Sequence, residues 1–216
     1  MSEILVWNGR LAQPRAVAAV RRRLGGVTEP PQPMTEEQLQ AVTVGELKPF
    51  AGRIELADYD PEWPSLFEHE AERIRRILGE RVLRIEHTGS TSVPGLPAKP
   101  IIDITLEVPD STDEAAYVVP LEAEGYRLTI REPDWYEHRL LKGPDTNINL
   151  HVFSQGCEET ERMVAFRDWL REHDADRELY ERAKRELARR EWKYVQNYAD
   201  AKTEVVREIL ARALAS

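Results

Sequence analysis

A loop rich in small and hydroxyl-bearing residues leads directly into a strand-like run that carries an acid. The stretch EHTGSTSVPGLPAKPIID covers residues 86–103. Its glycine lets the backbone approach a ligand, its hydroxyls and amides donate hydrogen bonds, and its lysine adds a positive charge, so the composition suits a phosphate or another anion. The candidate anion-binding residues are Gly89, Ser90, Thr91, Ser92 and Lys99. The alternative is a Ser/Thr-rich turn with a solvated lysine, because neither P-loop nor GxGxxG spacing occurs.

Asp103 is the carboxylate in this region with the clearest chemical use. In IIDITLEV, residues 101–108, successive side chains point to opposite faces of a strand, so Asp103 shares one face with Thr105 and Glu107. An acid between isoleucines is costly to bury unpaired, which favours a sheet end, a polar cleft or a metal site. Glu107 lies roughly 13 Å further along the strand, too far to bind the same ion directly.

A histidine on a second strand-like segment is the candidate partner of this acid. The segment is DTNINLHVF, residues 145–153, and alternation places His151 on the same face as Asn149. If the segment neighbours residues 101–108, His151 would lie beside Asp103 as a metal ligand or a general base. The alternative is a structural histidine that is hydrogen-bonded to a neighbouring strand.

The elements around these residues indicate an α+β domain after an N-terminal extension. Residues 1–50 contain the proline-rich segment GGVTEPPQPMTEEQ, which predicts a linker that is partly disordered or packed over the domain. A short helix over residues 35–42, capped by Thr35, fits within it. From residue 51 to 216 we expect a helix that starts at Asp60 and Pro61, then several strands, then a C-terminal helical segment.

Composition limits the classes of function. A formal net charge of -9 argues against a general nucleic-acid binder, because neutralising phosphates requires a basic face. Cys157 is the only cysteine, so no internal disulfide and no CxxC metal motif can form. No apolar run reaches the length of a membrane span, and the N-terminus lacks the features of a secretion signal. We therefore expect a cytoplasmic protein with a small-molecule or nucleotide ligand.

Several segments occur in an order that resembles the GrpB (UPF0157-type) family. They are DYDPEWPSLFEHE, EHTGSTSVPGLPAKPIIDITLEV, NLHVF, FRDWLREH, LYERAKRELA and YVQNYADAKTEVV. The resemblance runs from about Ile54 to Ile209, and GSTSVPGLPAKPIID is its most specific part. It implies a nucleotidyltransferase-like fold, in which helices pack on a mixed sheet. GrpB domains also occur fused to dephospho-CoA kinase, but this chain has no P-loop, so we do not expect that activity here.

The resemblance also implies roles for individual residues. Gly89 and Ser90 correspond to the Gly-Ser pair of the superfamily, and Asp103 corresponds to its first metal-binding acid. In that chemistry Mg²⁺ bridges the phosphates of ATP or another nucleoside triphosphate while a nucleotidyl group passes to a small molecule or a protein. The second acid of the pattern falls on Thr105, and the third corresponds to His151.

This departure leaves three possibilities open. One carboxylate makes a poor magnesium site, since this cation prefers several oxygen ligands. Either Glu86, Glu107 or Glu137 completes the site, or Asp103 and His151 bind something else, or catalysis is altered or lost. In the last case the chain would be an inactive module that binds a metabolite or a partner protein.

Basic residues in the C-terminal helices are further candidate phosphate ligands. Tyr180 and Lys184 share a helix face at i, i+4 spacing, as do Tyr198 and Lys202. Arg167 could contact a phosphate through two parallel hydrogen bonds. The alternative for these residues is surface ion pairing with neighbouring glutamates.

Overall fold

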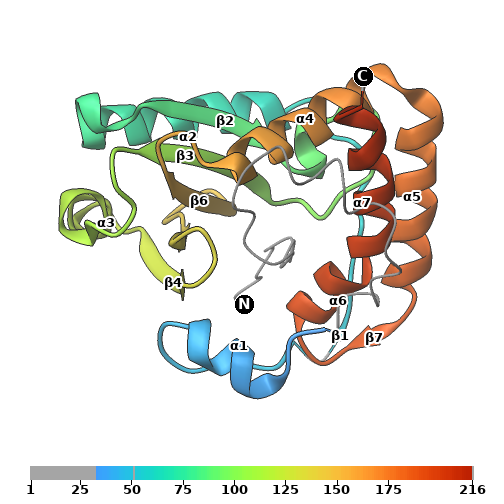
Figure 1. The fold of residues 1–216 in the computed structure, drawn as a ribbon, viewed down its shortest axis with the longest axis horizontal. Helices are drawn as coiled ribbons and strands as arrows, with labels where there is room; N and C mark the ends of the chain where they lie inside the picture. The colour runs from blue at the N-terminus through green and yellow to red at the C-terminus, as the bar shows by residue number, and fades with distance from the viewer. Residues whose placement is uncertain (1–32, 51, 216) are drawn as a thin grey trace.

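A five-stranded mixed sheet packed by helices forms the centre of the molecule (Figure 1). The computed structural model describes residues 33–50 and 52–215. The strand order is β2-β3-β6-β5-β4; β3 and β6 are parallel, and the other neighbours are antiparallel. The predicted α+β class is therefore confirmed. The strands of the sheet are β2 (Arg84–Thr88), β3 (Ile102–Val108), β4 (Arg127–Glu132), β5 (His138–Lys142) and β6 (Ile148–Ser154), and β1 (Gly52–Arg53) pairs with β7 (Glu191–Trp192) in a separate ribbon.

Helices lie on both faces of this sheet and beside one end of it, where α5 and α7 stand together (Figure 1). The α-helices are α1 (Glu36–Val42), α2 (Trp63–Leu78), α3 (Glu114–Ala123), α4 (Glu158–Glu172), α5 (Asp174–Ala188), α6 (Val195–Ala201) and α7 (Thr203–Ala213), and η2 (Gly79–Arg81) and η3 (Ser90–Ser92) are short 3-10 turns. Within residues 33–50 and 52–215, no helix is long and apolar enough to span a bilayer.

One face of the sheet is apolar and packs against α2 and α3. Because successive strand residues alternate between faces, every second residue of β3 and β6 enters this core. The core side chains of these two strands are Ile102, Ile104, Leu106, Val108, Ile148, Leu150 and Val152, and they meet Trp63, Phe67, Ala71, Ile74 and Leu78 of α2. The same alternation sends the polar residues between them, including Asp103 and His151, to the opposite face.

Two helix starts test the predicted caps. Thr35 caps α1 as predicted, because its Oγ1 accepts from the Gln38 amide while the Gln38 side chain accepts from the Thr35 amide. The prediction for α2 is wrong by two residues, since that helix begins at Trp63 and not at Pro61. Asp60 instead closes a turn ahead of the helix, where its Oδ1 accepts from the Glu62 amide at 2.9 Å.

The N-terminal extension is described from residue 33 onward, and residues 1–32 of the predicted 1–50 segment lie outside the described residues. Leu39 of α1 is fully buried in a cluster with Met34 and Tyr194. The Met34 amide donates to the Asp200 carboxylate at 2.9 Å. Residues 33–50 are thus packed against the C-terminal part of the chain.

Candidate functional site

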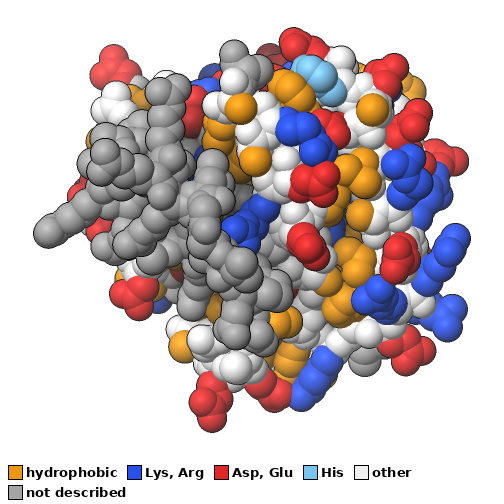
Figure 2. Space-filling view, turned by 45° about the vertical axis from the view of Figure 1, so that its right-hand side comes forward, with side chains coloured by type: hydrophobic (Ala, Val, Ile, Leu, Met, Phe, Trp, Pro, Cys, Tyr) orange, Lys and Arg blue, Asp and Glu red, His pale blue; other side chains and the backbone are white. Residues whose placement is uncertain are grey.

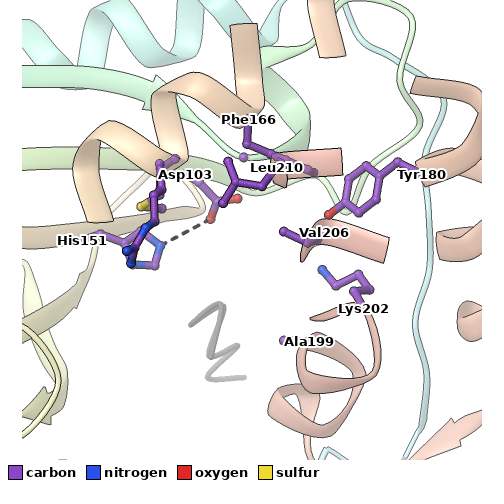
Figure 3. A pocket seen from close by; sticks show the side chains of 11 residues that line it. Asp103, His151, Phe166, Tyr180, Ala199, Lys202, Val206 and Leu210 are labelled. Carbon is purple, nitrogen blue, oxygen red and sulfur yellow. Dashed lines mark ion pairs between the residues drawn. The ribbon is translucent and has the colours of Figure 1, made fainter. Parts of the chain in front are cut away.

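The polar face of the sheet meets the C-terminal helices at two adjoining cavities. One has a volume of about 100 Å³ and is mainly apolar, and the other has about 70 Å³ and is more polar. The residues that border both are Gly89, Asp103, Phe166, Tyr180 and Lys202. Figure 3 shows Asp103 and His151 reaching the cavity from the sheet, while Tyr180 and Lys202 reach it from the helices on the other side. Residues far apart in sequence thus form one site.

Gly89 brings the hydroxyl-rich loop into contact with Asp103. Its φ of 68° and ψ of -172° lie in a region that glycine almost alone occupies. A Cβ atom at this position would lie 2.2 Å from Asp103 Oδ2, which is far inside van der Waals contact. Both the backbone conformation and the close approach therefore require glycine here.

Asp103 is 7% exposed and is held by polar neighbours on β6. Strands β3 and β6 are parallel neighbours, and Asp103 pairs with Asn149. The adjacency of the two strands that was needed to place His151 beside Asp103 is therefore present. Asn149 Nδ2 donates to Asp103 Oδ1 at 2.7 Å, and His151 Nε2 lies 3.8 Å from the same oxygen. Although burial raises it, the pKa of the Asp103 carboxyl falls below its ordinary value because of His151, Asn149 and Lys99. The group is therefore ionised at neutral pH.

Three lysines border the polar cavity, and each is more than nine-tenths buried: Lys99, Lys184 and Lys202. The Nζ atoms of Lys99 and Lys202 lie 5.8 and 4.7 Å from the centroid of the Tyr198 ring. Lys184 Nζ lies 4.9 Å from the Tyr180 ring. Lys184 Nζ also donates a hydrogen bond to the Pro97 carbonyl oxygen at 2.5 Å. Three amines therefore line the polar cavity, where Asp103 is the only acid among the described lining residues.

Burial is the main influence on two of these amines. It lowers the pKa of Lys202 to about 8, although Asp103 and Asp200 oppose the shift. Burial and the neighbouring Lys202 lower the pKa of Lys184 well below its ordinary value. An anion placed among them would favour their charged forms.

The three hydroxyl-bearing loop residues Ser90, Thr91 and Ser92 differ in whether they border the polar cavity. Ser90 borders the polar cavity and hydrogen-bonds with Tyr180. Thr91 also borders it, but its Oγ1 donates to a backbone carbonyl at 3.1 Å. Ser92 Oγ donates to the Gly89 carbonyl at 2.6 Å, and Ser92 borders a separate groove of about 410 Å³. Ser90 and Thr91 thus border the polar cavity, whereas Ser92 does not.

Arg167 lies on that separate groove, outside both cavities. Its guanidinium donates to Glu86 Oε2 at 2.8 Å and to Asp168 Oδ1 at 2.7 Å. The structure therefore brings six of the predicted phosphate-binding residues to the cavity with Asp103 and places two apart. Those at the cavity are Gly89, Ser90, Thr91, Lys99, Lys184 and Lys202, and those apart are Ser92 and Arg167.

The donors around Asp103 do not fit Mg²⁺. Thr105, where the resemblance expects a second acid, is fully buried and bonds to the Thr88 hydroxyl at 2.8 Å. Among the residues that the structure describes, no three His, Cys, Asp or Glu side chains are grouped as a metal ion needs. The nearby ammonium groups also repel a divalent cation. The other acids considered for this role lie elsewhere on the fold: Glu86, Glu107 and Glu137.

Sequence reasoning did not find the apolar cavity. Its wall comprises Met163, Phe166, Ala199, Val206 and Leu210. Val206 and Leu210 stand four residues apart, as on one helix face, but an apolar residue on such a face packs against another side chain more often than it borders a cavity. Two further buried residues that lie behind His151, Glu132 and His138, were also not singled out.

The protein is an α+β protein with a mixed five-stranded sheet. Amines line a cavity where this sheet meets the C-terminal helices. This arrangement is consistent with a nucleotidyltransferase-like class. A family model described as GrpB protein matches residues 53–212. The chain therefore belongs to the GrpB family, as its sequence motifs suggested.

Known relatives agree with this membership. UPF0157 protein BH1888 of Halalkalibacterium halodurans is 62% identical over 184 residues, which covers 85% of this chain and 94% of the relative. UPF0157 protein SCO7215 of Streptomyces coelicolor is 43% identical, covering 76% and 87%. A dephospho-CoA kinase of Mycolicibacterium paratuberculosis is 28% identical, but the match covers 46% of that enzyme. The crystal structure of conserved protein GrpB from Enterococcus faecalis superimposes with a TM-score of 0.65 at 33% identity, covering 74% of this chain and 98% of that chain.

Proposed function

We propose that this chain binds a phosphate-bearing small molecule, with a nucleotide such as ATP as the first candidate. The observation that supports the proposal is the surplus of buried amines around the polar cavity. Lys99, Lys184 and Lys202 border it, whereas Asp103 is the only acid among the described residues that line either cavity. The lining amines outnumber the lining acid, and an anionic ligand would add negative charge among them and favour their charged forms.

The shape of the site suggests a ligand with two chemically different ends. The phosphates would lie among the lysines, and an apolar or aromatic group would lie against Phe166, Val206 and Leu210. A cavity needs about 10–15 Å³ for each water, so the enclosed space holds on the order of ten waters. That space suits a diphosphate-sized group or a small ring, and a larger ligand would extend beyond it.

Calorimetric titration of the full chain with ATP, inorganic pyrophosphate and adenosine, with and without Mg²⁺, tests the proposal. We expect ATP and pyrophosphate to release binding heat and adenosine to bind at least about tenfold more weakly, since charged hydrogen bonds contribute about 1.5–3 kcal/mol each. Added Mg²⁺ should not be required. The absence of heat with both anions, or affinities that are the same in a Lys99→Met variant, would contradict the proposal.

The affinity for pyrophosphate is expected to fall as the pH rises from about 8 to 10. Burial holds the pKa of Lys202 at about 8 in the free protein, and a bound anion would raise it. Below the free pKa the lysine is charged in both states, whereas above it binding must take up a proton. Titrations at pH 8.5 in two buffers of different ionisation enthalpy should show uptake of on the order of one proton. Proton release, or an affinity constant across this range, would rule out the lysine as a contact.

Nucleotidyl transfer is the second candidate function. The observation that favours it is the ionised Asp103, with His151 beside it and with Gly89 packed against its carboxylate. Release of pyrophosphate from a nucleoside triphosphate, abolished in Asp103→Asn, would establish transfer. Binding that survives Asp103→Asn without any pyrophosphate release would leave the chain as a binding module.

A further inference from the structure

A buried row of ionisable side chains crosses the polar face of the sheet and reaches the cavity. Glu132 Oε2 lies 2.9 Å from His138 Nδ1, and His138 Nε2 lies 3.1 Å from His151 Nδ1. His151 Nε2, the last atom of the row, borders the cavity 3.8 Å from Asp103 Oδ1. The exposed fractions of Glu132, His138 and His151 are 2%, 0% and 2%. The three residues come from β4, β5 and β6, so neighbouring strands hold them in line.

The direction of the hydrogen bonds follows from what each atom can do. With Glu132 ionised, its carboxylate only accepts, so the hydrogen on His138 lies on Nδ1, where it is donated to Glu132. Burial, together with His151 and Arg139, lowers the pKa of His138 well below its ordinary value, so this ring is neutral and its Nε2 accepts. The donor to that nitrogen is then His151 Nδ1. In its neutral form His151 then carries no hydrogen on Nε2, whereas its imidazolium carries one there and pairs with Asp103.

The opposite direction fits the geometry less well. It would require a protonated Glu132 and an Nε2 hydrogen on His151, pointing at Asp103. The 3.8 Å separation of His151 Nε2 and Asp103 Oδ1 is too long for that hydrogen bond. The oxygen concerned already accepts from Asn149 at 2.7 Å.

We propose that Glu132 and His138 are positioning residues that fix His151 in its Nδ1–H tautomer, so that its Nε2 lone pair serves as a proton acceptor in the cavity. The inference rests on the proposed function in one respect, that a phosphate-bearing ligand occupies the cavity. A hydroxyl of that ligand, or a water beside it, would transfer its proton to Nε2 and keep the bonding electron pair on oxygen. The resulting imidazolium would be stabilised by the Asp103 carboxylate.

A purely structural role does not account for this arrangement. His138 stacks on Phe153, with 4.9 Å between ring centroids, and lies edge-on to Trp135 at 5.2 Å, so an apolar ring would pack there equally well. Buried polar groups are commonly no more stabilising than apolar replacements of the same volume. The turn that joins Glu132 to His138 also contains Tyr136 and Glu137, both with φ of 52°, a conformation that costs non-glycine residues energy. The burial of polar groups and the backbone strain both cost free energy, and such costs are expected where the orientation of a side chain, here that of His151, serves function.

The tautomers can be observed directly in the ligand-free full-length chain by long-range ¹H–¹⁵N correlation NMR at pH 8, because protonated and bare ring nitrogens resonate at well-separated ¹⁵N shifts. We expect a hydrogen on Nδ1 and none on Nε2 in both His138 and His151. A hydrogen on His151 Nε2 would overturn the proposal. The chain contains five histidines, so single His variants suffice to assign the signals.

Variants separate positioning from packing. In His138→Phe the Nδ1–H of His151 loses its acceptor, and we expect its hydrogen to move partly or fully to Nε2. The matched control is His69→Phe, on the exposed side of α2, which should leave the His151 signals unchanged. An unchanged His151 tautomer in His138→Phe would refute the positioning role, and the wild-type spectrum decides the question if that variant does not fold. Because no ligand is used, a failure of ligand binding would be seen separately by calorimetry.

Discussion

The Gly89→Ala variant is expected to lose detectable pyrophosphate binding and to unfold at a lower temperature than the wild type. An alanine at this φ and ψ costs about 1–3 kcal/mol in backbone strain. Its Cβ would also lie 2.2 Å from Asp103 Oδ2, so the carboxylate or the loop must move. Since each kcal/mol lowers the melting temperature of a chain of this size by about 2–4 °C, we expect a decrease of at least roughly 5 °C.

The control for this variant is Gly95→Ala in the same loop. Gly95 also has a positive φ, 77°, but a Cβ there would meet no atom within 4 Å. That variant should therefore show only the backbone cost, about 1–2 kcal/mol, and keep its affinity for pyrophosphate. Differential scanning calorimetry and isothermal titration of both variants measure the two quantities. Equal effects of the two substitutions would show that contact with Asp103 is unimportant.

The Lys202→Met variant is expected to be more stable than the wild type while it binds pyrophosphate about 10–100-fold more weakly, the loss expected for a charged hydrogen bond. Burial of the Lys202 amine opposes its charged form, as its lowered pKa indicates. A methionine of similar length removes that cost, and we expect a gain of about 1 kcal/mol in the free energy of unfolding. A variant that is more stable but binds pyrophosphate more weakly would identify Lys202 as a residue that serves binding at a cost in stability.

Lys193→Met provides the matched control for this second variant, because the Lys193 side chain is 62% exposed and forms a surface pair with Glu36. Its substitution should change both stability and affinity little, since exposed ion pairs are screened by solvent and contribute little to stability. Urea unfolding and calorimetry measure the two effects. A Lys202→Met variant that is less stable than the wild type would show that the ammonium supports the fold through Asp103 and Asp200.

Strand alternation made much of the fold predictable. It correctly placed Asp103, Thr105 and His151 on the face opposite the isoleucines, because the period of two in a strand leaves no choice once one face is apolar. The start of α2 was not predictable in the same way. Asp60 is a good cap by type, but its side chain accepts from the Glu62 amide in a local turn that precedes the helix, an alternative that short acids offer equally well.

The arrangement of the site was less accessible from the sequence, for two physical reasons. Arg167 and Glu86 are 81 residues apart, and no local spacing indicates that they form an ion pair. The position of His138 depends on the register of β5 against both β4 and β6, which a single sequence does not specify. By contrast, Lys184 and Lys202 were found because helical spacing put each on the same side as a tyrosine.

The polar side chains that border the polar cavity come from two stretches of the chain, one in its middle and one near its end. Ser90, Lys99 and Asp103 belong to the first, and Lys184 and Lys202 to the second. A bound anion would be held by both, so its concentration would add to the free energy of unfolding by mass action. A truncated chain that stops before α6 would lose Lys202, and would therefore lose one of the proposed contacts with the ligand even if its sheet still formed.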